Sequence, residues 1–427
     1  METPSDVIVV GAGLAGLVAA RTLAEAGLSV RVLEREAEVG GRQRTRTVDG
    51  FVLDRGFQLV NPAYPELPRH ADVDALGLQP FGAGVRVRTR RGLALLADPR
   101  REPRLAARTL RDGVRHGLLD ARELAALSRW AAPALAAPRV AKHRMDAPLI
   151  EAWDRAGVRG PLRDAVLEPF LRGVLADPDL TTSSRFTELL VRMFVLGTPG
   201  VPARGVAALP EQLAARVRAA GTRVTTGASV TAVRPAADGV VVDVAGGAPL
   251  HARAAVLAVG PEAFTGLLPE AASDRLPVPS RGLTTWWFRA PSAPARERFL
   301  AVDGTGSGPL VHTAVMTAAA PGLSPDGTPL VEATALLDPS APAVTDAQAR
   351  AHAARIWGVD ASDWDLLARD DVPYALPVQA APLRLRAEAR VAERVYAAGD
   401  HRDTASIQGA LVSGRRVAER LLHELSR

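Results

Sequence analysis

The first 60 residues alternate between short apolar runs and one longer segment with helical periodicity. Val7–Val10 is an uninterrupted apolar run, which is typical of a strand buried in a parallel sheet. Leu14–Ala26 has apolar residues at helical spacing, and Gly27 follows as a helix-ending residue. Ser29–Leu33 predicts a second strand. This order predicts a βαβ unit at the start of the chain.

The rest of the chain divides into a helical part and a part rich in strands. From about residue 105 to residue 194 the pattern is mostly helical, and Asp120 with Glu123 predicts a capping box ahead of one helix. A connector rich in Gly and Pro, Gly197–Pro202, leads into the second part. The elements expected after it are a helix at Glu211–Ala220, strands at Arg223–Thr225, Val230–Arg234, Val240–Val244, Ala254–Val259, Thr284–Arg289, Val311–Thr317 and Leu330–Leu337, a helix near Thr345–Trp357, a strand at Arg394–Ala398 and a closing helix from about Ile407 to Leu425.

Composition and charge narrow the class of protein. The chain has 427 residues, 47 % hydrophobic and 23 % charged, which is ordinary for a globular protein long enough for two domains. Its net charge is +5, and Lys142 is its only lysine. Because the arginines are interleaved with Asp and Glu, we interpret them as solvated surface and expect no nucleic-acid partner. The densest basic stretch, Arg86–Arg115, leaves contact with anionic lipid or an anionic substrate as an alternative.

The absence of cysteine excludes disulfides, thiol catalysis, cysteine-ligated metals and a flavin tethered through a cysteine. We expect no metal site. Residues 1–6 lead into the first strand without a signal-peptide pattern, and no apolar run approaches the roughly 20 residues of a membrane-spanning helix. The expected location is the cytoplasm, with contact at a membrane surface as the alternative. The sequence is silent on oligomeric state.

A glycine motif stands between the first predicted strand and the first predicted helix. It consists of Gly11, Ala12, Gly13, Leu14, Ala15 and Gly16. In such a GxGxxG motif the first glycine allows a tight turn, the second lets the backbone approach a pyrophosphate, and the third lets helix and strand pack closely. The free N–H groups of the helix N-terminus then face the phosphates. This context predicts a dinucleotide site without separating FAD from NAD.

Glu34 ends the second predicted strand, about 20 residues after the motif, where a carboxylate accepts the ribose hydroxyls of a dinucleotide. Its charge argues against a 2′-phosphate at the same place. Arg35 follows at the edge of this site, and its side chain should point away if Glu34 points in. A second glycine-rich run, Gly304–Gly308, ends at Pro309 without a helix and is interpreted as a hairpin loop. No NAD(P)H site is therefore expected.

Further short motifs extend over the chain. They are Gly40-Gly41-Arg42, Asp54-Arg55-Gly56-Phe57-Gln58, Gly205 with Leu209-Pro210, Val230-Thr231-Ala232-Val233, Val395-Tyr396-Ala397-Ala398-Gly399-Asp400 and Ser406-Ile407-Gln408-Gly409-Ala410. Together with the glycine motif, this set resembles the superfamily of FAD enzymes that includes phytoene desaturase, protoporphyrinogen oxidase and monoamine oxidase. The matches run from residue 7 to the last helix. The middle region resembles the superfamily only in its helical character.

The resemblance implies a set of residues that bind FAD noncovalently. It assigns Glu34 to the adenosine ribose, Gly41 and Arg42 to the pyrophosphate, Val230 to the adenine through its backbone, Gly399 and Asp400 to the ribitol chain, and Gln408, Gly409 and Ala410 to the flavin. The last three open the final helix. A helix N-terminus stabilises negative charge that develops on a reduced flavin, which agrees with that assignment.

The expected fold class is α/β, with a discontinuous Rossmann-like FAD-binding domain and a mixed α+β substrate domain. Residues 1–60, 198–275 and 385–427 would form the FAD-binding domain. Residues 61–197 and 276–384 would form the substrate domain. A substrate would then bind where the two domains meet, since ligand pockets commonly form at such interfaces.

Within the superfamily, the desaturase side agrees best with the sequence. Amine oxidases usually place a lysine near the flavin N5 on a strand that corresponds to about Gly282–Phe288, whereas the lysine of this chain lies in the helical region. They also place an aromatic ring three residues before the helix glycine, where this chain has Ser406. Trp286, with the neighbouring Trp287 and Phe288, could instead wall an apolar cavity. The catalytic residues stay open, with Gln58, Trp286, Tyr374 and His401 as candidates.

The resulting hypothesis is an FAD-dependent oxidoreductase that dehydrogenates or desaturates an apolar small molecule by hydride transfer to flavin N5. Electrons would leave to oxygen, a quinone or another acceptor. One alternative is a flavin amine oxidase. Another is a redox-neutral isomerase that needs reduced FAD, and a third is a flavin-bearing escort protein without turnover. Fold resemblance does not name the substrate.

Overall fold

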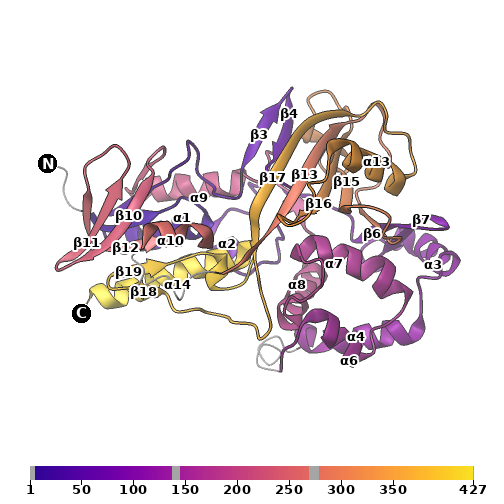
Figure 1. The fold of residues 1–427 in the computed structure, drawn as a ribbon, viewed down its shortest axis with the longest axis horizontal. Helices are drawn as coiled ribbons and strands as arrows, with labels where there is room; N and C mark the ends of the chain where they lie inside the picture. Colours follow the sequence, from indigo (N-terminus) through magenta and orange to yellow (C-terminus); the bar gives the residue numbers. More distant parts are fainter. Residues whose placement is uncertain (1–4, 137–144, 269–277, 427) are drawn as a thin grey trace.

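Two β-sheets organise the part of the chain that the computed structural model describes, residues 5–136, 145–268 and 278–426 (Figure 1). Both chain ends lie in the lobe of the first sheet, and a helical layer lies beside the second sheet. The long strand β17 (Asp365–Pro377) runs from one lobe toward the other. The α/β class expected from the sequence is confirmed.

The first sheet has the strand order β10-β11-β12-β1-β2-β9, with β19 and β18 continuing from β12. Its strands are β1 (Ser5–Val10), β2 (Val30–Leu33), β9 (Arg223–Thr225), β10 (Val230–Ala236), β11 (Gly239–Val244), β12 (Leu250–Leu257), β18 (Arg390–Ala392) and β19 (Val395–Ala397). β1 is paired in parallel with β2 and β12, which is the predicted βαβ arrangement around α1 (Leu14–Glu25). Helix α1 packs against α9 (Ala208–Ala219) and α14 (Ile407–Leu425).

The second sheet has the order β17-β13-β16-β15-β14-β6-β7. Its other strands are β6 (Gly84–Thr89), β7 (Gly92–Ala97), β13 (Ser280–Arg289), β14 (Leu300–Asp303), β15 (Leu310–Val315) and β16 (Leu330–Leu337). The larger helices beside it are α3 (Ala106–Arg115), α4 (Ala121–Ala136), α6 (Leu149–Ala156), α7 (Glu168–Leu175), α8 (Ser184–Leu196) and α13 (Asp346–Trp357). The two sheets draw on the chain segments expected for the two domains, and the functional division into domains stays a prediction.

Short elements connect these layers. They are the strands β3 (Thr45–Val48), β4 (Phe51–Asp54), β5 (Gln79–Pro80) and β8 (Gly200–Val201), the helices α2 (Leu67–His70), α10 (Phe264–Leu267) and α12 (Met316–Ala319), the π-helical turn η2 (Arg163–Leu167), and the 3-10 turns η1 (Pro103–Leu105), η3 (Pro261–Ala263), η4 (Pro321–Leu323) and η5 (Asp400–Arg402). The turn η5 separates the last strand from α14 and becomes important below.

The predicted capping box at α4 is half correct. Asp120 Oδ1 accepts a hydrogen bond from the Glu123 N–H at 2.8 Å, as an N-cap should. The Glu123 carboxylate instead accepts from the N–H groups of Leu162 and Arg163, at 3.0 and 2.7 Å. Glu123 therefore caps the start of a different helical segment, which the local sequence pattern around residue 120 does not indicate.

The glycine-rich run Gly304–Gly308 is a hairpin loop, as predicted, because it joins the antiparallel strands β14 and β15. The Asp303 carboxylate holds this loop by accepting hydrogen bonds from the backbone and hydroxyl groups of Thr305 and Ser307. Burial is the largest single effect on the pKa of Asp303 and raises it. These hydrogen bonds and one from His352 together outweigh burial and lower the pKa below its usual value. The loop is thus closed by its own side chains.

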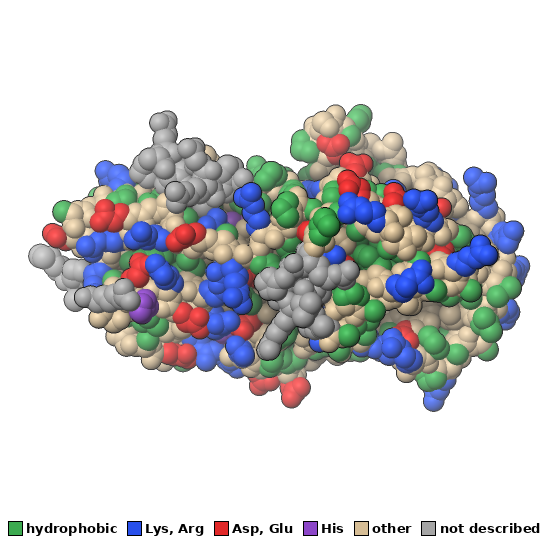
Figure 2. Space-filling view, turned by 90° about the horizontal axis from the view of Figure 1, so that it is seen from below, with side chains coloured by type: hydrophobic (Ala, Val, Ile, Leu, Met, Phe, Trp, Pro, Cys, Tyr) green, Lys and Arg blue, Asp and Glu red, His purple; other side chains and the backbone are tan. Residues whose placement is uncertain are grey.

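Basic and acidic side chains are intermixed over the face seen in Figure 2. Part of the basic stretch 86–115 is structural: Arg86 pairs with Glu297 at 2.5 Å, and Arg101 donates to backbone carbonyls at the end of α8. No helix in the described ranges is long and apolar enough to cross a membrane.

The contact between α1 and α14 gives a prediction about stability. A Cβ at Gly414 would lie 2.3 Å from the Ala15 carbonyl oxygen, a backbone atom that cannot easily move. Gly414→Ala should lower the free energy of unfolding by about 1–3 kcal/mol through overpacking, even though alanine is the better helix former. Urea denaturation of the apoprotein measures this. The control is Gly322→Ala, at an exposed position where a Cβ meets nothing within 4 Å, and equal midpoints for the two variants would refute the close contact.

Candidate functional site

A cavity of about 490 Å³ opens at the carboxyl ends of β1 and β2, the edge where open α/β sheets commonly bind ligands. Seven separate segments of the chain, between residues 10 and 410, line it. The predicted site residues among them are Gly11, Gly13, Leu14, Ala15, Glu34, Arg35, Gly41, Arg42, Gln58, Val230, Gly399, Asp400 and Ala410. The structure therefore brings most of the predicted residues together at one place.

The three glycines of the motif differ in what surrounds them. A Cβ at Gly11, which has φ +101°, would lie 2.6 Å from the Ala258 oxygen, and a Cβ at Gly16 would lie 2.1 Å from the Gly11 oxygen. These two glycines permit close backbone packing. A Cβ at Gly13 would meet nothing within 4 Å, so this residue leaves space in the cavity. The α1 N-terminus has no side-chain cap, which leaves its N–H groups for an anion.

Glu34 lies directly after β2, and its side chain is buried in the wall of the cavity. Its carboxylate accepts hydrogen bonds from the N–H groups of Ala12 at 2.7 Å and Glu36 at 3.0 Å. These bonds fix the carboxylate next to the glycine motif. Arg35 is exposed and pairs with Glu36 at 3.3 Å, so its guanidinium points away from Glu34. That is the orientation expected from the sequence.

An ion pair joins two motifs that lie 358 residues apart in the chain. Arg42 Nη2 contacts Asp400 Oδ1 at 2.5 Å, and Arg42 Nη1 donates to the Ala375 carbonyl at 2.8 Å. Gln58 donates from Nε2 to the carbonyls of Arg42 and Arg55, at 2.8 and 3.0 Å. One wall of the cavity is thus assembled from residues near 42, 58, 375 and 400.

The N-terminus of α14 also borders the cavity. Ser406 caps this helix by accepting from the Gly409 N–H at 3.1 Å, and Ser406 and Ala410 line the cavity. Gly409 lies behind them, where a Cβ would lie only 1.8 Å from the Thr404 oxygen. The glycine at 409 is therefore required by backbone packing, and it does not itself line the cavity.

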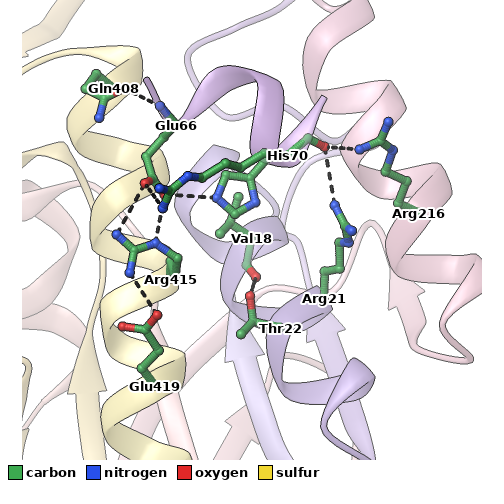
Figure 3. Close-up of polar contacts among 10 residues, drawn as sticks. Val18, Arg21, Thr22, Glu66, His70, Arg216, Gln408, Arg415 and Glu419 are labelled. Atoms are coloured by element: carbon green, nitrogen blue, oxygen red, sulfur yellow. Dashed lines mark hydrogen bonds and ion pairs between the residues drawn. The ribbon is translucent and has the colours of Figure 1, made fainter. Parts of the chain in front are cut away.

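Gln408, which was expected to bind the flavin, does not line the cavity. Its Oε1 accepts from the Glu66 N–H at 2.9 Å (Figure 3). Glu66 in turn binds Arg415 at 2.8 Å and lies 3.2 Å from the ring of His70. This buried network fixes α14 against α2, so Gln408 positions the helix that the cavity uses.

The aromatic residues of β13 belong to packed cores. Trp286 is completely buried, its Nε1 donates to Asp346 at 2.8 Å, and it packs with Phe288 in the core that includes α13. Trp287 is buried in another core on the opposite face of the sheet. The expectation that these rings wall an open cavity is therefore corrected. Alternation along a strand sends neighbouring side chains to opposite faces, and both faces of β13 are covered.

The remaining catalytic candidates occupy different environments. His401 is buried outside the cavity lining, with its ring 5.4 Å from that of Phe264, and burial lowers its pKa to about 4. It is therefore neutral near pH 7. Tyr374 is half exposed on β17 and does not line the cavity. Gln58 is the one catalytic candidate that lines it. Lys142 lies outside the described residues.

The geometry fits a dinucleotide: a glycine turn, an uncapped helix N-terminus, a buried carboxylate after β2, and a second helix N-terminus that borders the cavity. No group of three or more metal-ligating side chains occurs in the described parts of the chain.

Comparison with known proteins agrees with this geometry. A sequence model of the family described as flavin containing amine oxidoreductase matches residues 14–422. Putrescine oxidase from Kocuria rosea is 54 % identical over 76 residues, 18 % of this chain and 16 % of that protein. The 4,4′-diapolycopene oxygenase from Methylomonas sp is 54 % identical over 50 residues, 12 % of this chain and 10 % of that protein. The aligned segments thus span less than a fifth of either relative.

Among solved structures, an oxidoreductase from Methanosarcina mazei has a TM-score of 0.76 at 17 % identity, covering 97 % of this chain and 99 % of that one. This likeness shows a common fold over nearly the whole chain. The family match covers both sheets except strand β1, and it covers every motif after the first two glycines. The chain therefore belongs to the flavin containing amine oxidoreductase family.

Proposed function

We propose that the cavity holds FAD in an extended conformation between the N-termini of α1 and α14. Glu34 would bind the adenosine ribose, the α1 N-terminus and Arg42 the pyrophosphate, and Asp400 the ribitol chain. Val230, at the start of β10, lines the adenine end. The observation that carries this assignment is the open space at Gly13 beside the buried Glu34 carboxylate. Bound FAD would supply the two-electron acceptor of the reaction.

The role of Glu34 gives the first prediction about the cofactor. Glu34→Gln removes the charge from two ribose hydrogen bonds, each worth roughly 1.5–3 kcal/mol when one partner is ionised. FAD affinity should fall at least about tenfold, since about 1.4 kcal/mol corresponds to that factor. Titration of the apoprotein with FAD, followed by flavin fluorescence, measures it. Glu38→Gln, which changes an exposed carboxylate that does not line the cavity, is the matched control and should leave the affinity unchanged. An unchanged affinity for Glu34→Gln would show that Glu34 does not bind the ribose.

Gly13 gives a second prediction, because its surroundings separate folding from binding. Its φ of −75° suits alanine, and an added Cβ would meet no protein atom within 4 Å. Gly13→Ala should leave the stability of the apoprotein unchanged. It should weaken FAD binding at least about tenfold, because the methyl group would overpack the space beside the pyrophosphate. Denaturant titration and FAD titration of the same variant test both parts, and full FAD affinity would contradict the assignment.

We also propose that the substrate is an apolar small molecule that loses hydrogen at carbon. The observation that carries this proposal is Ser406 in the cavity wall, where amine oxidases place an aromatic ring. Its hydroxyl is engaged in capping α14. The strand β13, where such enzymes place a lysine, contains none in this chain. The chain's residues would hold the substrate and exclude water, since position is the main requirement for hydride transfer. Oxygen, a quinone or another acceptor would take the electrons.

One observation favours amine oxidation as a second candidate. Glu332 is fully buried, and its Oε2 has no hydrogen-bond partner. It lies on the same face of the second sheet as Thr285 and His312, whose ring is 4.7 Å from Phe57, next to Gln58 of the cavity wall. A buried carboxylate on this face could attract an ammonium group.

A single kinetic experiment distinguishes the two. Anaerobic stopped-flow absorbance of the oxidised flavin should show no useful reduction by benzylamine, putrescine or spermine, because the aromatic guide for an amine is absent at Ser406. A carotenoid precursor, a sterol-like compound or a tetrapyrrole should bleach the flavin. Rapid bleaching by an amine would reject the apolar substrate, and its loss in Glu332→Gln would then establish the second candidate.

A further inference from the structure

A second cavity of about 450 Å³ lies on the other side of the turn η5, under the loop that joins β17 to β18. This loop runs below α14 in Figure 1. The residues of this cavity that matter here are Leu383, Arg384, Leu385, Arg390, Val391 and Arg402. Three of them are arginines and three are apolar. The turn η5 thus sends Asp400 to the first cavity and Arg402 to the second.

Arg402 is a buried cation without a matching anion. Its exposed fraction is 6 %. Nη2 donates to the backbone carbonyl of Glu388, and Nε has no hydrogen-bond partner. No carboxylate in the described ranges forms an ion pair with it. Buried charges are ordinarily paired, because removing an ion from water is costly unless an opposite charge compensates.

The other buried arginines of the described chain show the contrast. Arg86 pairs with Glu297 at 2.5 Å, and Arg163 pairs with Asp154 at 2.6 Å and with Glu168 at 2.9 Å. Each therefore carries its own counter-charge. Arg402 is the exception, and it is also the one whose side chain lines a cavity.

The charges around Arg402 make the site more positive. Arg384 and Arg390 line the same cavity and are exposed. Arg416 on α14 lies nearby and is paired with Asp403 at 3.2 Å. Burial lowers the pKa of Arg402, Arg416 lowers it further, and the exposed Glu388 acts in the opposite direction. Glu388 lines the same cavity, and Glu424 interacts with Arg390, so three arginines at this site stand against two carboxylates.

We propose that this second cavity binds a phosphate group, with Arg402 at its base and Arg384 and Arg390 at its mouth. A guanidinium presents paired N–H donors that match phosphate oxygens, and it stays charged when buried. Leu383, Leu385 and Val391 form an apolar wall beside these donors. Both a free phosphate compound and the headgroup of an anionic lipid present this chemistry. The site is separate from the FAD cavity and does not depend on the substrate of the enzyme.

The test uses the FAD-loaded protein and inorganic phosphate. Isothermal titration at constant ionic strength, with chloride as the competing anion, should give saturable binding to the unmodified chain. Arg402→Met and Arg390→Met should each weaken it at least about tenfold, because each removes charge-assisted hydrogen bonds. Arg386→Met is the matched control, since Arg386 is an exposed arginine of the same loop that does not line the cavity. Arg390 is exposed, so its variant should fold even where Arg402→Met does not.

A second arm identifies the source of the phosphate group. Phosphatidylcholine vesicles with and without phosphatidic acid are sedimented with the same four proteins. Binding that needs phosphatidic acid and is lost in Arg402→Met or Arg390→Met supports a lipid headgroup, whereas binding of inorganic phosphate alone supports a free compound. Equal binding by all four proteins, in either arm, would indicate general surface attraction and overturn the proposal. So would the absence of binding in both arms.

Discussion

The close approach of three backbone segments at the glycine motif is the constraint on which the site depends. Gly11 packs against the carbonyl of Ala258, and Gly16 packs against the carbonyl of Gly11. On the opposite side of α1, Gly414 of α14 packs against the carbonyl of Ala15. These contacts fix the direction of α1, so its uncapped N-terminus opens into the cavity instead of into a packed core. A larger side chain at any of the three positions would move the helix.

Once α1 is fixed, the rest of the site is assembled from distant parts of the chain. The sheet places Glu34 after β2, and the pair between Arg42 and Asp400 ties the early motifs to the turn before α14. The network of Glu66, Arg415 and Gln408 holds α14 from its other side. The N-termini of two helices, α1 and α14, therefore border one cavity, as binding of a dinucleotide requires. Most charged side chains that line the cavity are already paired within the protein, as in the pairs of Arg42 with Asp400 and of Arg35 and Arg44 with Glu36.

The sequence predicted those parts that depend on local backbone chemistry. The glycine turn, the carboxylate after β2 and the start of α14 require particular residues at fixed spacing, and each lies at the cavity. It did not predict the hairpin of β6 and β7, since the arginines that alternate with valines there were interpreted as surface charge. It also missed β17, an edge strand with polar residues on both faces and hence no apolar alternation.

Directions of side chains were harder to predict than positions. Trp286 and Trp287 are both apolar, so periodicity gives no indication of which face meets a substrate. Gln408 follows the cap of α14, but its partner Glu66 lies 342 residues away. Whether Arg402 has a counter-charge depends on how the turn η5, the loop between β17 and β18, and helix α14 pack together. Such features arise from tertiary packing, and no pattern along the chain encodes them.

A crystal structure of the protein purified with its flavin would test the central claim most directly. The account predicts one FAD in the cavity between α1 and α14, with its ribose hydroxyls bonded to Glu34 and its pyrophosphate against the backbone at Gly13. A flavin bound elsewhere, or in this cavity with Glu34 still bonded only to the protein backbone, would contradict the account.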